Sequence, residues 1–393
     1  MKFLITLTCV LLLTLTTNAK IRRVGFTDVP PVIGVDYTNF YLAYGEAANG
    51  DTVYVFPGKT LVDGWPNGNI NIKKKLILIS KGNWLDSSSS PKGNFGLQVS
   101  KGTAFFSANV TFYPESEGSV ISGFDGQGYR VYIWASNITI KRNFNLLVFL
   151  DNFNISNLLV EGNYRVWFTG NPNVNNIYSN IQIKNNFIYQ FQLPLKSYTG
   201  TIENNIWAFD RTLTQAQNGG DIVMAYYSEF NSSTWVQSNI NLQSGSWIFQ
   251  NNLMVSYFNS NVANNRNIFV INGAENSTLN YNAALASYNF TAWPGTATGN
   301  IFIPLSQVNQ IFAGFPAIGT KSADNRYLLA AGSPANNANR PGSVTDAGMF
   351  GGTKPYKLST IPSIPTIYKI SSPQGNNPIG NTIEIDFGTR SNN

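Results

Sequence analysis

Four acidic residues and two arginines are the residues of this sequence best suited to acid–base chemistry. The acids are Asp125, Asp151, Asp210 and Asp221, and the arginines that could serve as bases or clamps are Arg165 and Arg211. Hydrolysis of a glycoside normally uses two carboxyl groups about 5–10 Å apart, and the sequence places no two of these four at that separation. Asp210 and Arg211 are adjacent beside an expected insertion, an arrangement that a surface ion pair explains equally well.

The chain of 393 residues contains no histidine. This excludes Ser-His-Asp and Cys-His nucleophilic sites, histidine-ligated zinc and a histidine general base. Chemistry by carboxylates, Lys, Arg or Tyr remains open, and so does binding without chemistry. The single cysteine, Cys9, lies in the apolar N-terminal stretch, so the rest of the chain can form no disulfide.

The segment YRVYIWAS alternates apolar and aromatic residues with the period of a strand. When Val131 and Ile133 face inward, Tyr132 and Trp134 face outward, where flat aromatic rings can stack on sugar rings. The preceding FDGQG contains Asp125, which could accept a hydrogen bond from a sugar hydroxyl or form an Asx-turn. Tyr132 and Trp134 are therefore candidate ligand-binding residues.

Three further aromatic residues, Trp167, Tyr189 and Trp207, each follow a repeated asparagine. Their offsets from that asparagine are four, three and two residues. If these side chains point outward, they extend a glycan-binding platform, and if they point inward, they form stacks in the core. The sequence leaves both arrangements open.

A repeat of about twenty residues must position these side chains. The strings NITIKRNF, NLLVEGNY, NIQIKNNF and TGTIENNI share alternating apolar residues, a charged residue, an asparagine and a large apolar residue. The separations between successive repeated asparagines are 20, 23, 19, 47 and 48, for Asn143, Asn163, Asn186, Asn205, Asn252 and Asn300. Such a period with short β-branched runs predicts a solenoid of stacked strands. Each of the two long gaps is about two periods, which predicts a coil without the signature.

Aligned asparagines would form a ladder, in which each amide hydrogen-bonds to the next coil and each asparagine adopts a left-handed backbone. The residues two positions earlier alternate in charge along the first four coils: Lys141, Glu161, Lys184, Glu203 and then Gln250. Opposite charges directly across neighbouring strands stabilise a sheet. The alternation predicts that these coils are adjacent in this register and that the charged residues are structural rather than catalytic.

Two segments carry a family resemblance. ANGDTVYVFPGKT at 48–60, after the short helix expected in TNFYLAYGEA, resembles the N-terminal capping coil of right-handed parallel β-helix proteins of the pectin lyase-like superfamily. Residues 327–352 and the following PYKLSTIPSIPTIYKI resemble the terminal coil and exit segment of secreted bacterial members. The resemblance implies an all-β, right-handed parallel β-helix (a β-solenoid) with an N-terminal cap and loop insertions.

This resemblance does not select an activity, because the superfamily includes lyases, hydrolases, epimerases and adhesins. Polygalacturonase-like members use a histidine and paired aspartates, and this sequence has no histidine and no Asp-Asp pair. Pectate-lyase-like members hold calcium through acids on neighbouring coils. Here the acids that share a column are Glu161 and Glu203, and the coil with Lys184 separates them.

The N-terminal stretch from Met1 to Ala19 is apolar, begins with a lysine and ends in small residues, which is typical of a secretory signal cleaved after Ala19. The expected organisation is a signal peptide over 1–19, an extended segment with the N-terminal cap over 20–50, the parallel β-helix over 51–362 and a C-terminal tail over 363–393. A second apolar stretch of membrane-spanning length does not follow.

The net charge of +6 is spread thinly, with one basic block at 73–75, so a nucleic-acid partner is not expected. We expect a secreted or cell-surface monomer with a non-catalytic role, binding a polysaccharide or cell-surface glycan or adhering to a surface, without a metal or cofactor. The alternative is a polysaccharide lyase or glycoside hydrolase that uses Asp or Glu with Arg or Lys, with calcium if it is lyase-like. A purely structural surface protein, without a ligand, is the third interpretation.

Overall fold

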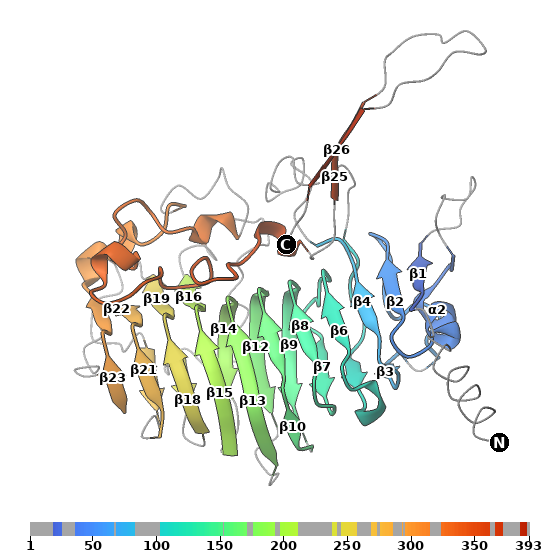
Figure 1. Cartoon of the computed structure of the whole chain (residues 1–393), viewed down its shortest axis with the longest axis horizontal. Coiled ribbons are helices and arrows are strands. Elements are labelled where there is room, and N and C mark those ends of the chain that lie inside the picture. Colours follow the sequence, from blue (N-terminus) through green and yellow to red (C-terminus); the bar gives the residue numbers. More distant parts are fainter. Residues whose placement is uncertain are drawn as a thin grey trace, which may run out of the picture.

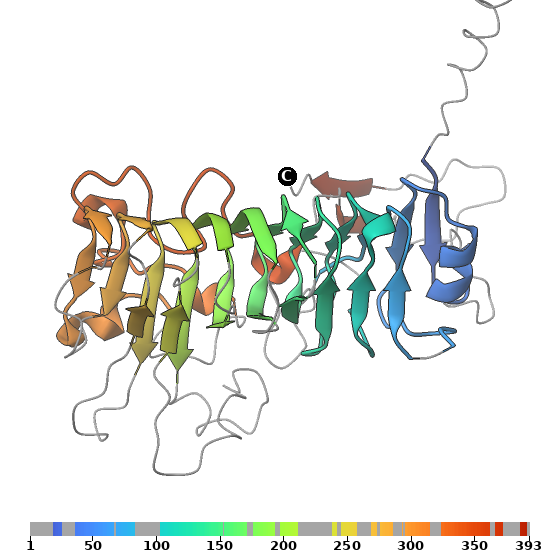
Figure 2. The same ribbon diagram turned by 90° about the horizontal axis from the view of Figure 1, so that it is seen from below.

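The computed structural model describes residues 19–25, 36–66, 68–82, 103–151, 153–170, 176–192, 197–210, 238–241, 245–257, 269–272, 276–285, 293, 295–314, 324–361, 366–371 and 386–390. This part of the chain is mostly β-structure, and two long parallel sheets dominate it. Figures 1 and 2 show the strands side by side along the long axis of an elongated molecule.

Sheet A contains twelve strands in the described part of the chain. In spatial order they are β1 (Ile21–Val24), β2 (Thr52–Val55), β4 (Ile77–Ile79), β6 (Val120–Ser122), β8 (Thr139–Lys141), β11 (Leu159–Glu161), β13 (Ile177–Lys184), β15 (Ser197–Glu203), β18 (Gly245–Gln250), β21 (Thr278–Asn280) and β23 (Thr296–Thr298), with β10 (Ile155–Ser156) beside β13.

Sheet B contains ten strands in the same described residues. They are β3 (Ile70–Ile72), β5 (Val110–Phe112), β7 (Arg130–Ile133), β9 (Phe144–Leu150), β12 (Tyr164–Gly170), β14 (Phe187–Gln192), β16 (Ile206–Asp210), β19 (Leu253–Tyr257), β22 (Ala283–Leu285) and β24 (Ile301–Ile303). From β2 to β24 the chain passes back and forth between the two sheets, except that β10 and β11 both lie in sheet A and that β17 and β20 pair with each other, and the strands within each sheet pair in parallel. This topology is compatible with the predicted solenoid.

The remaining elements are short. They are helix α2 (Phe40–Glu46), the 3-10 turns η1 (Pro114–Ser116), η3 (Leu305–Gln310), η5 (Asn325–Tyr327), η6 (Asn337–Asn339) and η7 (Leu358–Thr360), the parallel pair β17 (Ser238–Asn241) and β20 (Phe269–Asn272), and the antiparallel pair β25 (Thr366–Ser371) and β26 (Asp386–Arg390). Helix α2 confirms the expected cap helix, and it begins where the Asn39 side chain accepts a hydrogen bond from the Leu42 amide. No helix in the described residues is long and apolar enough to cross a membrane.

The apolar residues at alternate positions of each repeat face the core. Ile138, Ile140, Ile181 and Ile183 are all fully buried, as the two-residue period predicts. Successive coils bring these side chains into register, so Val160 pairs with Ile140 on one side and Ile183 on the other. Stacking therefore continues one apolar core from coil to coil.

A continuous asparagine ladder runs beside this core. Each ladder oxygen accepts from the backbone and side-chain amides of the preceding asparagine, as when Asn186 Oδ1 accepts from both Asn163 nitrogens at 2.9 Å. The ladder begins with the Phe124 amide on Asn143 Oδ1 and ends at Asn300. Its members, apart from the partly exposed Asn300, are fully buried, so these bonds satisfy amides that water cannot reach.

Two details of the predicted ladder are wrong. Asn205 bonds directly to Asn252 at 3.0 Å, so the gap of 47 residues is an insertion within one coil and not a missing coil. The second gap does contain a coil, whose ladder residue is Asn282. The left-handed residue is the one before each ladder asparagine, such as Asn185 with φ 54° and Asn204 with φ 54°. A positive φ there turns the chain at the bend and lets the next side chain point inward.

Residues 340–361, here called the strap, return along these bends and contribute no strand to either sheet (Figure 1). Asn185 Nδ2 donates to two strap carbonyls, Met349 at 3.0 Å and Gly351 at 2.7 Å. Arg142 donates to the Ile361 carbonyl at 3.0 Å. The expected terminal coil over 327–352 therefore differs from what is observed. That segment is rich in Gly, Asn and Pro and lacks the alternating apolar residues that a strand requires.

Candidate functional site

The outer side of sheet B carries a group of partly exposed aromatic side chains. Six partly exposed side chains form this aromatic face: Tyr113, Tyr132, Trp134, Phe149, Phe153 and Trp167. Val131 and Ile133 are fully buried, so the prediction that Tyr132 and Trp134 point outward is confirmed. Tyr132, Phe149 and Trp167 lie on β7, β9 and β12, and Tyr113, Trp134 and Phe153 follow β5, β7 and β9.

Contacts between the rings arrange the aromatic face in two rows. Trp134 lies between Tyr113, at 4.8 Å edge-on, and Phe153, stacked at 5.2 Å. Tyr132 lies 5.0 Å from Phe149, its register partner on the next coil. The outer side of a solvated sheet is usually polar, and contiguous exposed apolar surface marks binding sites.

Cationic side chains lie over the rings at the edge of the aromatic face. The Lys73 ammonium lies 4.8 Å from the centre of the Tyr113 ring, and the Arg130 guanidinium lies 5.4 Å from that of Phe149. Arg130 also donates to the Tyr132 hydroxyl at 3.1 Å. The face thus combines flat apolar surface with donors that can reach hydroxyl or carboxylate oxygens of a ligand.

The other three aromatic candidates, Trp167, Tyr189 and Trp207, differ in strand alignment and therefore in burial. Trp167 aligns with Leu147 on the outer side of sheet B and stays partly exposed. Tyr189 is 3% exposed and packs against Trp167 at 5.3 Å, at a register shift between β12 and β14. Trp207 aligns with the buried Ile188 and lies in the core at 2% exposure. Its assignment as a ligand-binding candidate is therefore wrong.

Asp125 occupies an aromatic column near this face. Its backbone forms isolated β-bridges to Phe105 and Phe144. Its carboxylate accepts a hydrogen bond from the Gln127 amide at 2.8 Å, which forms the Asx-turn that the sequence suggested. Burial raises the pKa of Asp125 to about 6, although the Gln127 amide and the Arg165 guanidinium oppose the rise. The fold therefore places the Arg165 guanidinium close enough to Asp125 for its charge to act on the carboxylate.

Arg165 is 9% exposed, and its backbone φ is 59°. Its guanidinium lies 5.8 Å from the centre of the Phe144 ring and 5.9 Å from that of Tyr189. A positive φ is uncommon for a residue other than glycine, asparagine or aspartate. The bend at Arg165 thus directs a cation across aromatic rings and toward Asp125.

The remaining acid–base candidates are Asp151, Asp210, Arg211 and Asp221. Asp151 follows β9, and one of its carboxylate oxygens is buried without a hydrogen-bond partner among the described residues. Asp210 is the last residue of β16. Arg211 and Asp221 lie outside the described residues.

The alternating charges of sheet A adopt the predicted register. Glu161 pairs in register with both Lys141 and Lys184. Lys184 forms an ion pair of 2.9 Å with Glu203, which also accepts from Gln250 Nε2 at 2.7 Å. These contacts support the structural interpretation of the column.

A charged groove that was not predicted from the sequence lies beside this column. Lys354 and Lys357 of the strap face Lys141, Arg142 and Glu161 across a cavity of about 290 Å³. Burial and the positive charges of Arg142 and Lys354 lower the pKa of Lys141, although Glu161 opposes this. No local signal in the sequence joins residues 141 and 354, because only docking of the strap brings them together.

The described residues do not offer a calcium cage. No group of three or more acidic, histidine or cysteine side chains converges within the described part of the chain. Glu203 is occupied by Lys184 and Gln250, whereas calcium takes six to eight oxygen ligands. The charged column therefore does not fit the calcium that a lyase-like activity would imply.

The raised pKa of Asp125 predicts a pH-dependent stability. The pKa of Asp125 in the folded state, about 6, exceeds its ordinary value of 3.8. Protonation of Asp125 therefore stabilises the folded state fully below pH 3.8, and this stabilisation is lost as the pH rises through about 6. Asp125→Asn should remove this loss of about 1–3 kcal/mol. Urea unfolding of both proteins at pH 4 and pH 7 measures it, and an identical pH dependence in both would contradict the assignment.

Comparison of the chain with models of protein families, with curated proteins and with solved structures finds no match.

Proposed function

We propose that the chain is a secreted right-handed parallel β-helix protein that binds a polysaccharide or cell-surface glycan on the aromatic face without turning it over. The alternation of the chain between two parallel sheets and the continuous asparagine ladder support the β-helix. The observation that carries the binding role is the aromatic face itself, where partly exposed rings contact one another across neighbouring coils.

An extended polymer suits this surface better than a small ligand. The rows of rings follow the direction in which the coils stack, since Tyr132 and Phe149 are register partners on successive strands. Sugar rings have apolar faces that stack on aromatic rings, while their hydroxyl groups need donors and acceptors. Arg130 and the Tyr132 hydroxyl provide these at the edge of the rings.

Replacement of Trp134 with alanine should weaken glycan binding by about tenfold or more, because a central aromatic residue of an interface contributes about 2 kcal/mol. Titration calorimetry against neutral and anionic polysaccharides measures the affinity. The matched control is Tyr41→Ala on α2, since Tyr41 is 42% exposed and is not a residue of the aromatic face. Equal losses in both variants, or no binding to any glycan by the unmodified protein, would contradict the proposal.

A lyase or hydrolase is the second candidate, and two observations favour it. Asp125 has a pKa of about 6 beside Arg165, a combination typical of acid–base sites. The groove under the strap also gathers several charged side chains. However, the charged neighbour found for Asp125 is an arginine and not the second carboxyl group that glycoside hydrolysis normally uses.

A turnover assay separates the two candidates. The purified protein is incubated with anionic and neutral polysaccharides, with and without calcium, and unsaturated products and new reducing ends are measured. Under our proposal neither product accumulates. Turnover that disappears in Asp125→Asn but persists in Trp134→Ala would replace the binding role with an enzymatic one.

A further inference from the structure

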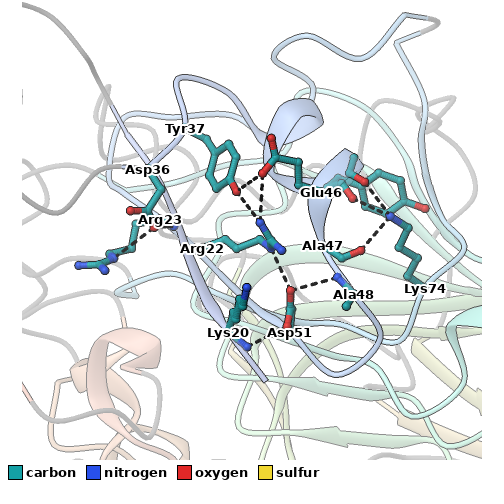
Figure 3. A network of polar contacts seen from close by, with 12 residues as sticks. Lys20, Arg22, Arg23, Asp36, Tyr37, Glu46, Ala47, Ala48, Asp51 and Lys74 are labelled. Carbon is teal, nitrogen blue, oxygen red and sulfur yellow. Dashed lines mark hydrogen bonds and ion pairs between the residues drawn. The ribbon is translucent and has the colours of Figure 1, made fainter. Parts of the chain in front are cut away.

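The N-terminal cap holds a buried carboxylate that contacts the first described residues of the chain (Figure 3). Asp51 is 2% exposed. Its Oδ1 accepts from the backbone nitrogen of Lys20 at 2.8 Å, and its Oδ2 accepts from Arg22 Nε at 2.9 Å and from the Ala48 amide at 3.0 Å. Three donors from two segments thus converge on one carboxylate.

The charges of this network do not balance. Arg22 lies between two carboxylates, Asp51 at 2.9 Å and Glu46 at 3.4 Å. The Tyr37 hydroxyl accepts from Arg22 and donates to Glu46 at 2.7 Å, and it adds no charge at neutral pH. Within this set of side chains one cation thus faces two anions, while Lys74 of the same cap donates to the backbone carbonyls of Tyr44, Gly45 and Ala47. Arg23 and Asp36 form a separate neutral pair at 3.4 Å.

Both backbone groups of Lys20 are held in place, whereas the residue itself is exposed. The Thr52 amide donates to the Lys20 carbonyl at 2.8 Å, and β1 begins at the next residue. Ala19 is exposed as well. The apolar stretch that ends in Thr17, Asn18 and Ala19 has the small residues that a signal peptidase accepts.

We infer that the expected cleavage after Ala19 places the new α-ammonium group of Lys20 in an ion pair with Asp51. A peptidase adds water across the bond, so that Ala19 leaves with a carboxylate and Lys20 gains an amino group that takes up a proton at neutral pH. The inference rests on the secretory route of the proposed function and does not depend on glycan binding.

The new ammonium group improves the cap in two ways. It replaces a neutral amide donor by a charged one, and a charge-assisted hydrogen bond is roughly twice as strong. It also adds a second cation beside Arg22, so that two cations face the two carboxylates of Asp51 and Glu46. Burial disfavours the Asp51 carboxylate, but the donors from Lys20, Ala48 and Arg22 outweigh it and lower the pKa of Asp51.

The pairing has a defined pH window. An α-amino group in an unfolded chain has a pKa of about 8, and pairing with Asp51 raises the folded value. The stabilisation is therefore complete below about pH 8 and is lost as the pH rises through the folded pKa. The charged or titratable groups around the site are Arg22, Tyr37, Glu46, Asp51, the exposed Lys20 side chain, Lys74 on the carbonyl of Ala47, and the Arg23–Asp36 pair.

Two measurements test the inference. The mass of the protein exported from an expressing bacterial cell should correspond to a chain that starts at Lys20. The folding equilibrium constant of that chain at pH 6 should exceed that of the same chain with Gly-Ser added before Lys20 by about tenfold, and the difference should vanish above pH 10.

Variants of the cap keep the test specific. Asp51→Asn should abolish the difference between the two forms, whereas the matched control Asp36→Asn, in the separate pair with Arg23, should preserve it. An exported chain that starts elsewhere, or equal stability of the two forms at pH 6, would overturn the inference. Glycan titration of the extended form is a separate readout, so failure here is distinguishable from failure of the proposed function.

Discussion

Replacing Asn186 with alanine should lower the free energy of unfolding by about 3–5 kcal/mol, because buried donors and acceptors lose their partners. Asn186 Oδ1 accepts from both nitrogens of Asn163 at 2.9 Å, and Asn186 Nδ2 donates to Val160 O at 2.9 Å and to Asn205 Oδ1 at 3.1 Å. Alanine removes all four bonds. The Asn163 amides then lie in an interior that water does not reach.

Urea unfolding followed by circular dichroism measures this effect. The matched control is Asn71→Ala on the outer side of β3, where burial alternates and Asn71 is partly exposed. Substitutions on a surface usually change stability by less than about 0.5 kcal/mol. A loss of less than about 1 kcal/mol for Asn186→Ala would show that the ladder does not stabilise the stack.

Gly200→Ala should destabilise the protein by about 3 kcal/mol or more, at the upper end for overpacking. Gly200 lies on β15 opposite Ile181 of β13, at a register shift between the strands. A Cβ at Gly200 would lie 2.0 Å from the Ile181 carbonyl oxygen and 2.8 Å from its carbon. Because these are backbone atoms of a paired strand, the clash can be relieved only by moving the two coils apart.

Gly45→Ala is the control for this substitution. Gly45 lies in helix α2, and a Cβ there meets nothing within 4 Å. Alanine in a helix is favoured over glycine by about 1 kcal/mol, so this variant should be slightly more stable. Thermal unfolding of both variants tests the pair, and similar melting temperatures for the two would contradict the close approach of β13 and β15.

Two side chains of the charged groove under the strap also belong to the cross-strand column of sheet A. Lys141 and Glu161 belong to the cross-strand column, where opposite charges stabilise the sheet. The same side chains line a cavity together with Lys354 and Lys357. A structural role in the column therefore does not prevent contact with an anionic group of a ligand, such as the carboxylate of an acidic glycan.

The sequence by itself determined the features that depend on local pattern and repetition. Alternation identified the outward Tyr132 and Trp134, and the period aligned the ladder asparagines. The charge alternation of Lys141, Glu161 and Lys184 indicated the register of neighbouring coils. These inferences succeed because a strand alternates its side chains between two faces, and because stacked coils place equivalent residues one above another.

Only the tertiary structure decided the features that depend on bends and distant contacts. Trp207 lies in the core because it aligns with Ile188, which aligns with the buried Val166 after the register shift at Arg165. The meeting of Asp125 with Arg165 depends on a left-handed bend two coils away. The groove depends on the strap, whose docking onto the bends joins residues about 200 positions apart and leaves no periodic trace in the sequence.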